Sequence, residues 1–214
     1  MKLLKLLAVT AILAVSTSAF AQMYDLPIMF GIQGGWYHNA LNAEYNQDVP
    51  FLGDKGDPYS TKTNFYEIDA FFDASFLRVS IGYAGNIGDT SYEMGSESGD
   101  VEITKKTLEF SAFFKYPLAM GYENATFYPM IGINYSNILT LEDEDGEDMS
   151  DDVDLNDFYL MLGVGGDFAV SEKVFIVPSV LFGINLTPDA YDSDAIDSTF
   201  SYKFGINVAV GFKL

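Results

Sequence analysis

The 214-residue chain contains no cysteine, a single histidine and only 11 basic residues. The absence of cysteine excludes a disulfide-stabilised scaffold, a thiolate metal site and a lipid anchor attached to cysteine. The 11 lysines and arginines stand against 31 acidic residues, which gives a formal net charge of −20. This balance excludes the basic footprint that nucleic-acid-binding proteins need. Long apolar runs are also missing after residue 21, so we expect no transmembrane helix there.

Residues 1–21 have the pattern of a cleaved secretory signal peptide. Lys2 and Lys5 precede a short apolar run over residues 6–15, and Ala19-Phe20-Ala21 fits the small-residue cleavage site. The apolar run is too short to cross a bilayer as a helix. The pattern therefore predicts export, with residues 22–214 forming one domain.

Eight segments of the remaining chain alternate between apolar residues and polar or small ones. The longest is 200–214, where every even-numbered residue is apolar. A period of two indicates a β-strand with two unlike faces, and this length suits a tilted strand that crosses a bilayer better than a soluble strand. The predicted strands are 28–37, 63–73, 76–84, 105–116, 125–136, 157–168, 174–186 and 200–214.

The connections between these strands alternate between long and short. The long ones are 38–62, 85–103, 137–156 and 187–199, and they are rich in acidic, Gly and Ser residues. An even number of strands with short periplasmic turns and long extracellular loops is typical of bacterial outer-membrane barrels. We therefore predict an all-β, eight-stranded antiparallel up-and-down transmembrane β-barrel with both termini periplasmic. Pro129 and Pro178 lie within strands, and we expect β-bulges there.

The two faces of the strands distinguish a membrane barrel from a soluble one. One face is apolar and carries no charge in the central span, whereas the other carries charged and polar residues. Burying the charged face as a dry core would cost several kcal/mol for each unpaired charge. The pattern predicts apolar residues against lipid and a charge network in the lumen. A soluble lipocalin-like barrel is the alternative for the fold, and hydrated lumen charges are the alternative for the network. The network residues are Glu67, Asp69, Arg78, Glu109, Lys115, Asp167 and Lys203.

Several of these features together resemble the OmpA/OmpX/OmpW-like small outer-membrane barrels. They are the signal peptide, the eight alternating strands, the segment FYPMIGINY at 127–135 with its echo IVPSVLFGIN at 176–185, and the aromatic-rich last strand. The resemblance implies a monomer in the outer membrane of a diderm bacterium, in contact with its lipids and folded by the barrel-assembly machinery. Family members often end in Phe, whereas this chain ends in Leu214. The residues that the resemblance assigns to the assembly signal are Tyr202, Phe204, Ile206, Val208, Val210, Phe212 and Leu214.

The third long connection is strongly acidic and contains no basic residue. Oxygen-rich clusters of this kind suit Ca²⁺ or Mg²⁺, and the candidate ligands are Asp143, Asp145 and Asp152. The segment does not match the EF-hand template, because Gly146 at its sixth position puts Leu141 where the first ligand should be. The alternative is a solvated acidic loop without bound metal. No other cofactor is expected.

The sequence indicates function only in outline. The acidic long connections should attract cations or basic partners, so we expect a structural or surface-interaction protein with cationic or host surface ligands and no catalytic residue. An eight-stranded lumen is just wide enough for side chains, and a narrow channel or binder for small apolar or cationic solutes is the alternative. A third hypothesis is a lipid-modifying enzyme in which His38 acts with Asp89, Thr90 or Ser91, although no spacing shows that these residues meet.

Overall fold

The computed structural model describes residues 28–48, 54–74, 76–95, 97–118, 124–147, 156–187 and 196–214, with only the backbone described for 196–199. The predicted signal peptide lies outside these ranges. Within them, no helix has the length and apolar character needed to cross a membrane.

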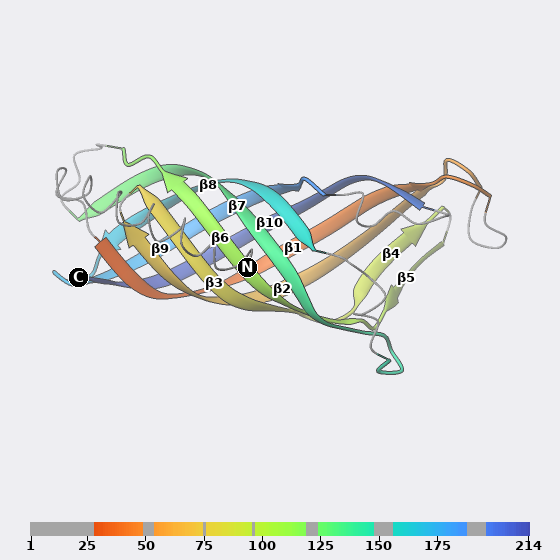
Figure 1. Cartoon of the computed structure of the whole chain (residues 1–214), viewed down its shortest axis with the longest axis horizontal. Coiled ribbons are helices and arrows are strands. Elements are labelled where there is room, and N and C mark those ends of the chain that lie inside the picture. Colours follow the sequence, from red (N-terminus) through yellow and green to blue (C-terminus); the bar gives the residue numbers. More distant parts are fainter. Residues whose placement is uncertain are drawn as a thin grey trace, which may run out of the picture.

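The described chain forms ten β-strands, shown in Figure 1. Eight of them match the eight predicted strands, and two short ones are additional. Their bounds are β1 (Ile28–Tyr45), β2 (Pro58–Ala74), β3 (Leu77–Asn86), β4 (Thr90–Met94), β5 (Glu97–Val101), β6 (Thr104–Lys115), β7 (Ala125–Glu142), β8 (Asp157–Ala169), β9 (Val174–Asn185) and β10 (Ile196–Lys213).

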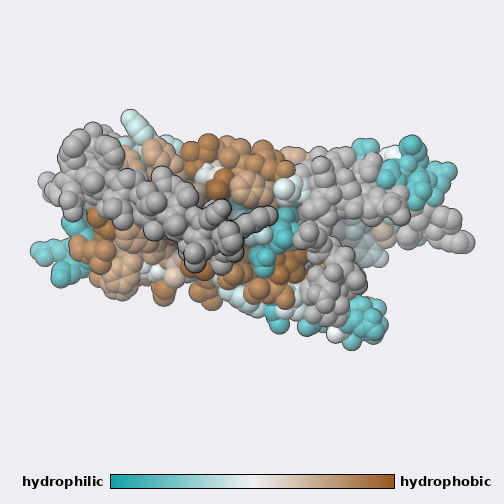
Figure 2. Space-filling view, in the orientation of Figure 1, coloured by the Kyte–Doolittle hydropathy of each residue, from teal (hydrophilic) through white to brown (hydrophobic). Residues whose placement is uncertain are grey.

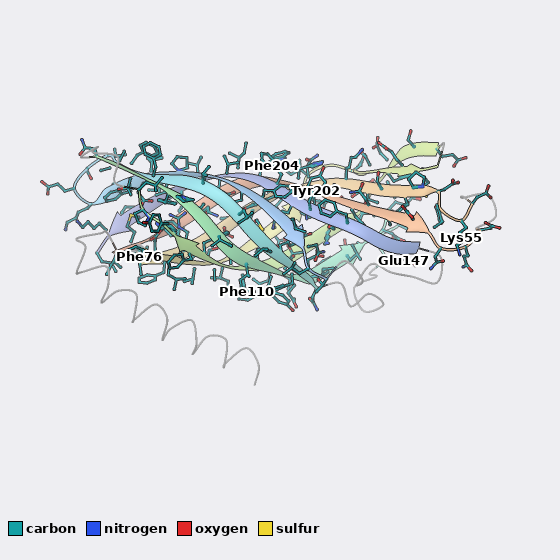
Figure 3. The ribbon with its side chains drawn as sticks, turned by 90° about the horizontal axis from the view of Figure 1, so that it is seen from above. Lys55, Phe76, Phe110, Glu147, Tyr202 and Phe204 are labelled. Carbon is teal, nitrogen blue, oxygen red and sulfur yellow. The ribbon has the colours of Figure 1, made fainter. Side chains whose placement is uncertain are left out.

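Eight of these strands close into a ring of antiparallel neighbours. The order is β1-β10-β9-β8-β7-β6-β3-β2, and the ring closes because β1 pairs with β2 as well as with β10. The prediction of an all-β, eight-stranded up-and-down barrel is thus confirmed. Figure 3 shows Phe76 at one end of the barrel, and Lys55 and Glu147 at the opposite end. We call the end with Phe76 the short-connection end and the opposite one the long-connection end.

At the long-connection end the strands are longer than predicted. The prediction of a loop over all of 38–62 is wrong, because β1 runs on to Tyr45 and β2 already begins at Pro58. Similarly, β7 continues to Glu142 and β10 starts at Ile196. The main-chain ladder continues there, with Glu44 opposite Pro58 and Tyr45 opposite Ile196. Apolar and polar residues do not alternate regularly in these parts, so the pattern that reveals a strand is missing from the sequence.

The prediction that residues 85–103 form a loop is also wrong. It contains β4 and β5, which form a hairpin with Met94 opposite Glu97. Strand β4 also pairs with β2 from Tyr59↔Met94 to Lys62↔Ser91, outside the ring. The sheet β10-β1-β2-β4-β5 therefore continues past the ring on one side of the barrel (Figure 1). We call this part the extension; it comprises β4, β5 and residues 196–201, 40–45 and 58–64.

The prediction of bulges at Pro129 and Pro178 is wrong. The register shifts at Asn42/Ala43 in β1 and at Lys106/Thr107 in β6 instead. Pro129 needs no bulge. A residue at this position would point its N–H towards β6, but the pairing of β6 with β7 ends at Lys115↔Met130, so no hydrogen bond of the ladder is lost. At Pro178 the ladder is interrupted without a shift, since β8 and β9 pair up to Gly165↔Ser179 and again from Phe168↔Ile176.

The outer face of the barrel is apolar, as the alternation predicts, and the charged side chains of the central strands lie inside. The outward side chains Ile32, Ile68 and Val164 are 64%, 61% and 60% exposed, whereas Glu109 and Lys203 are 3% exposed inside the ring. Figure 2 shows apolar residues along the middle of the molecule and hydrophilic ones towards its ends. In a soluble barrel the charged side chains would lie on the outside instead, and the outer face would not be a continuous apolar surface.

Candidate functional site

Four charged side chains meet inside the ring nearer the short-connection end. Nε and Nη2 of Arg78 lie 2.9 and 2.8 Å from Oδ2 of Asp73, and Lys115 Nζ lies 2.6 Å from the same oxygen. Asp167 lies 3.5 Å from Lys115 Nζ and accepts a hydrogen bond of 2.8 Å from the Tyr128 hydroxyl. The two acids and two bases balance in charge, which is what buried ions require. We call Asp73, Arg78, Lys115 and Asp167 the lower cluster.

Asp73 is missing from the predicted network, although it is completely buried and contacts both cations. Two signals in the sequence point to it. It has the same strand parity as Glu67 and Asp69, so it faces the interior. The short connection between β2 and β3 also places it directly opposite Arg78.

The second group of charges surrounds Lys203. Its Nζ lies 3.5 Å from Glu67 Oε2 and 3.3 Å from Glu109 Oε2. Asp69, next to Glu67 on the same face of β2, accepts a hydrogen bond of 2.8 Å from Gln33 Nε2. We call Glu67, Asp69, Glu109 and Lys203 the upper cluster. Glu109 accepts further hydrogen bonds from the side chains of Thr107, Ser136 and Asn134.

A layer of apolar and aromatic side chains connects the two clusters. The ring of Tyr128 lies 4.2 Å from Lys115 Nζ, and the ring of Tyr37 lies 4.3 Å from Lys203 Nζ. Both rings belong to one buried group, so the interior is filled from one cluster to the other. The seven predicted network residues are thus divided between two groups rather than joined in one. The members of the layer are Tyr37, Phe65, Phe113, Tyr128, Met130, Tyr159, Met161 and Leu181.

Glycines in the wall make room for this filling. A Cβ atom on Gly82 would collide with the Asp69 carboxylate, and one on Gly35 would collide with the Asn207 side chain. Small residues opposite large inward side chains are what a narrow barrel needs to pack its interior.

The extension carries a polar cleft on its outward face. The register aligns Ser60, Glu93 and Ser98 in one row across β2, β4 and β5. The cleft has a volume of about 340 Å³, and Tyr92 and Gly99 complete its lining. The second row is Lys62, Ser91 and Asp100.

Two side-chain contacts organise the cleft. Lys62 Nζ lies 2.7 Å from Glu93 Oε1, and the Ser91 hydroxyl donates to Asp100 Oδ1 at 2.8 Å. The hydrogen bond to Glu93 raises the pKa of the exposed Lys62 above its ordinary value. The only base in the cleft is therefore charged at neutral pH and paired with an acid.

The comparisons with known proteins give a fold rather than a family. No family model and no curated protein matches the sequence. The outer membrane protein OprG from Pseudomonas aeruginosa has a similar structure, with a TM-score of 0.50 and 14% identity over 88% of this chain and 96% of that one. The fold is that of a small outer-membrane β-barrel.

Two further solved structures are outer-membrane-type barrels of the same kind. Neisserial surface protein A gives a TM-score of 0.45 and 15% identity over 86% of this chain and 97% of that one. Ail, the attachment invasion locus protein of Yersinia pestis, gives a TM-score of 0.37 and 13% identity over 88% and 100%.

His38 lies on the outside of this outer-membrane-type barrel. Its ring stacks on Trp36 at 6.2 Å, and its Nδ1 lies 3.1 Å from Asn64 Oδ1. The hydroxyls proposed as its partners make other contacts, since Thr90 bonds to Thr63 and Ser91 to Asp100. In the described part of the chain, His38 therefore lies in a belt of aromatic rings that includes Trp36 and Tyr202.

The acidic residues predicted to bind metal are only partly described. Asp143 Oδ1 accepts hydrogen bonds from the backbone N–H groups of Asp145 and Glu147, at 3.1 and 2.9 Å, in a turn where Gly146 has a φ of 79°. Asp152 lies outside the described residues. Among those described, no three acidic or histidine side chains converge to hold a metal ion.

The residues of the predicted assembly signal share one face of β10. Ile206, Val208 and Phe212 are 49%, 53% and 43% exposed on the outside of the barrel. Leu214 follows the strand, and its N–H donates to the carbonyl of Ile28 in β1 at 2.9 Å. The remaining members, Tyr202, Phe204 and Val210, have the same strand parity.

Proposed function

We propose that this protein is a closed barrel of the bacterial outer membrane that acts at the cell surface through its extension, without catalysing a reaction. In this proposal residues 1–21 are removed on export, the short-connection end and both termini face the periplasm, and the extension projects outward. The observation that carries the proposal is the continuation of β10-β1-β2-β4-β5 past a barrel whose interior is filled.

The distribution of side chains supports the membrane location. A broad outer face of exposed Ile, Leu, Val and Phe would be costly in water, and it suits contact with lipid. Aromatic residues lie at both ends of this face, with the Tyr66–Tyr83 pair towards the extension and the Phe127–Phe168 pair towards the short-connection end. Such girdles mark the two interfaces of membrane barrels.

The charge of the outward-facing end supports a surface role. The connections there carry most of the acidic residues of a chain whose net charge is −20. This field attracts cations and basic partners and repels anions. The outer-membrane lipids and the barrel-assembly machinery are the other partners that we propose, the latter reading the outward residues of β10.

The filled interior predicts that the barrel does not conduct ions. Purified protein inserted in a planar bilayer should show no resolved current steps in 1 M KCl at either polarity. The reason is that two ion-paired clusters and the buried layer between them lie across the interior and should block a continuous water path. Single-channel recording measures this directly.

A known porin inserted in the same bilayers serves as the positive control. Reproducible current steps that scale with salt, and that change when Lys203 is replaced by Met, would contradict a closed barrel. They would favour the narrow channel for cationic solutes.

A further inference from the structure

Among the residues that the structure describes, strand β5 ends the sheet of the extension and pairs with β4 alone. Only residues 95 and 96 separate the two strands, so Met94 and Glu97 form the closing pair of a two-residue hairpin. In such a hairpin the two residues of the closing pair exchange main-chain hydrogen bonds. The N–H and C=O groups of the next residue along the strand point away from the partner strand. The N–H and C=O groups of Ser98 and Asp100 therefore point to the open edge.

The edge is continuous with the polar cleft. The side chains of Ser98 and Asp100 line the cleft together with Ser91 and Glu93 of β4. A strand added beside β5 would place every second side chain on this face of the sheet. Main-chain pairing at an edge with a cleft for alternate side chains is how extended peptides are recognised.

The charges around the edge select the kind of strand that can join. Glu97 and Asp100 are exposed on β5, and Glu93 is exposed beside them on β4. Lys62 is the only base in the cleft, and it is paired with Glu93. Two copies of β5 would put like charges opposite each other, which is unfavourable, whereas a basic segment is complementary.

We propose that β5 accepts an extended basic peptide segment as an additional strand, with alternate lysine or arginine side chains over Asp100 and Glu93. This inference rests on the proposed function, because in the cell the edge of β5 must face outward from the membrane to meet such a segment.

The test uses the purified barrel in detergent and a ten-residue peptide that alternates lysine and threonine. Binding is measured by fluorescence anisotropy of the labelled peptide. We expect binding of this peptide, and at least about a tenfold loss of affinity, or ~1.4 kcal/mol, when its alternate main-chain nitrogens are methylated. A peptide with glutamate in place of lysine should not bind.

A pair of variants separates strand addition from charge attraction. Ser98→Pro removes a main-chain donor at the open edge but none that pairs with β4, and it should weaken binding about tenfold. The matched variant Ser98→Ala also lacks the hydroxyl but keeps the N–H, so Ser98→Pro should bind about tenfold more weakly than Ser98→Ala. Equal affinity of Ser98→Pro and Ser98→Ala, or equal affinity for the methylated and unmethylated peptides, would overturn the proposal. Absence of any binding by the lysine peptide would overturn it too.

A separate experiment tests the outward orientation that the proposed function requires. A Ser98→Cys variant on intact cells should react with a membrane-impermeant maleimide. If the purified protein binds the peptide while this cysteine is protected on cells, the binding site stands and the outward orientation is wrong.

Discussion

Asp73→Ala is expected to lower the free energy of unfolding by about 3–5 kcal/mol, because it leaves buried cations without their main partner. Asp73 is 0% exposed and its Oδ2 contacts both Arg78 and Lys115 within 3 Å. In the variant, Asp167 alone faces two buried positive charges. Urea titration of the barrel folded into lipid vesicles measures the loss, with the fluorescence of Trp36 as the probe, since the chain has one tryptophan.

The control for this variant is an ion pair of similar length at the surface. Lys62 and Glu93 are 2.7 Å apart but 43% and 62% exposed, so Lys62→Ala should leave the urea midpoint unchanged. The double variant Asp73→Ala, Lys115→Met should be less destabilised than the sum of the single variants, because it removes one of the stranded charges. A midpoint for Asp73→Ala equal to that of Lys62→Ala would show that the lower cluster is hydrated and does not hold the barrel together.

Leu162→Arg is expected to destabilise the barrel in lipid by about 2–4 kcal/mol, the cost of a basic side chain on the lipid face near the bilayer midplane. Leu162 is 49% exposed on the outside of β8, and it lies near the middle of the span between Phe158 and Phe168. The same vesicle titration measures the effect.

The matched substitution is Ser98→Arg on the extension, where the added side chain is in water. It should leave the urea midpoint of the barrel unchanged. If Leu162→Arg were tolerated as well as Ser98→Arg, the outer face of β8 would not be in hydrocarbon.

The sequence is sufficient to predict the ring and its two faces, because a strand between lipid and lumen must alternate. The sequence is not sufficient to predict the extension, because this alternation is missing there. Residues 40–45 and 58–64 pair with their neighbours through the main chain, which every sequence shares. Their apolar and polar residues do not alternate regularly, and a register shift at Asn42/Ala43 interrupts the period in β1. The hairpin of β4 and β5 is hidden for the same reason, since Ser, Gly and acidic residues also suit a loop.

The grouping of the interior charges was only partly predictable. Parity places Glu67, Glu109 and Lys203 in the lumen, but not at the same height. Their contact depends on how far each tilted strand is shifted along its neighbours, and that stagger is a property of the closed barrel. The pairing of Asp73 with Arg78 is different, because a tight connection fixes it locally, and the sequence contained enough information to find it.

The central claim is that odd and even residues of each strand lie on opposite sides of the barrel wall. Because the chain has no cysteine, single cysteines at neighbouring positions test it most directly. Leu162→Cys and Val208→Cys should react with a maleimide dissolved in the lipid of vesicles, whereas Met161→Cys and Asn207→Cys, whose native side chains are each 1% exposed, should be protected. Labelling of residues 161 and 207 with protection of 162 and 208 would mean that the barrel is inside out.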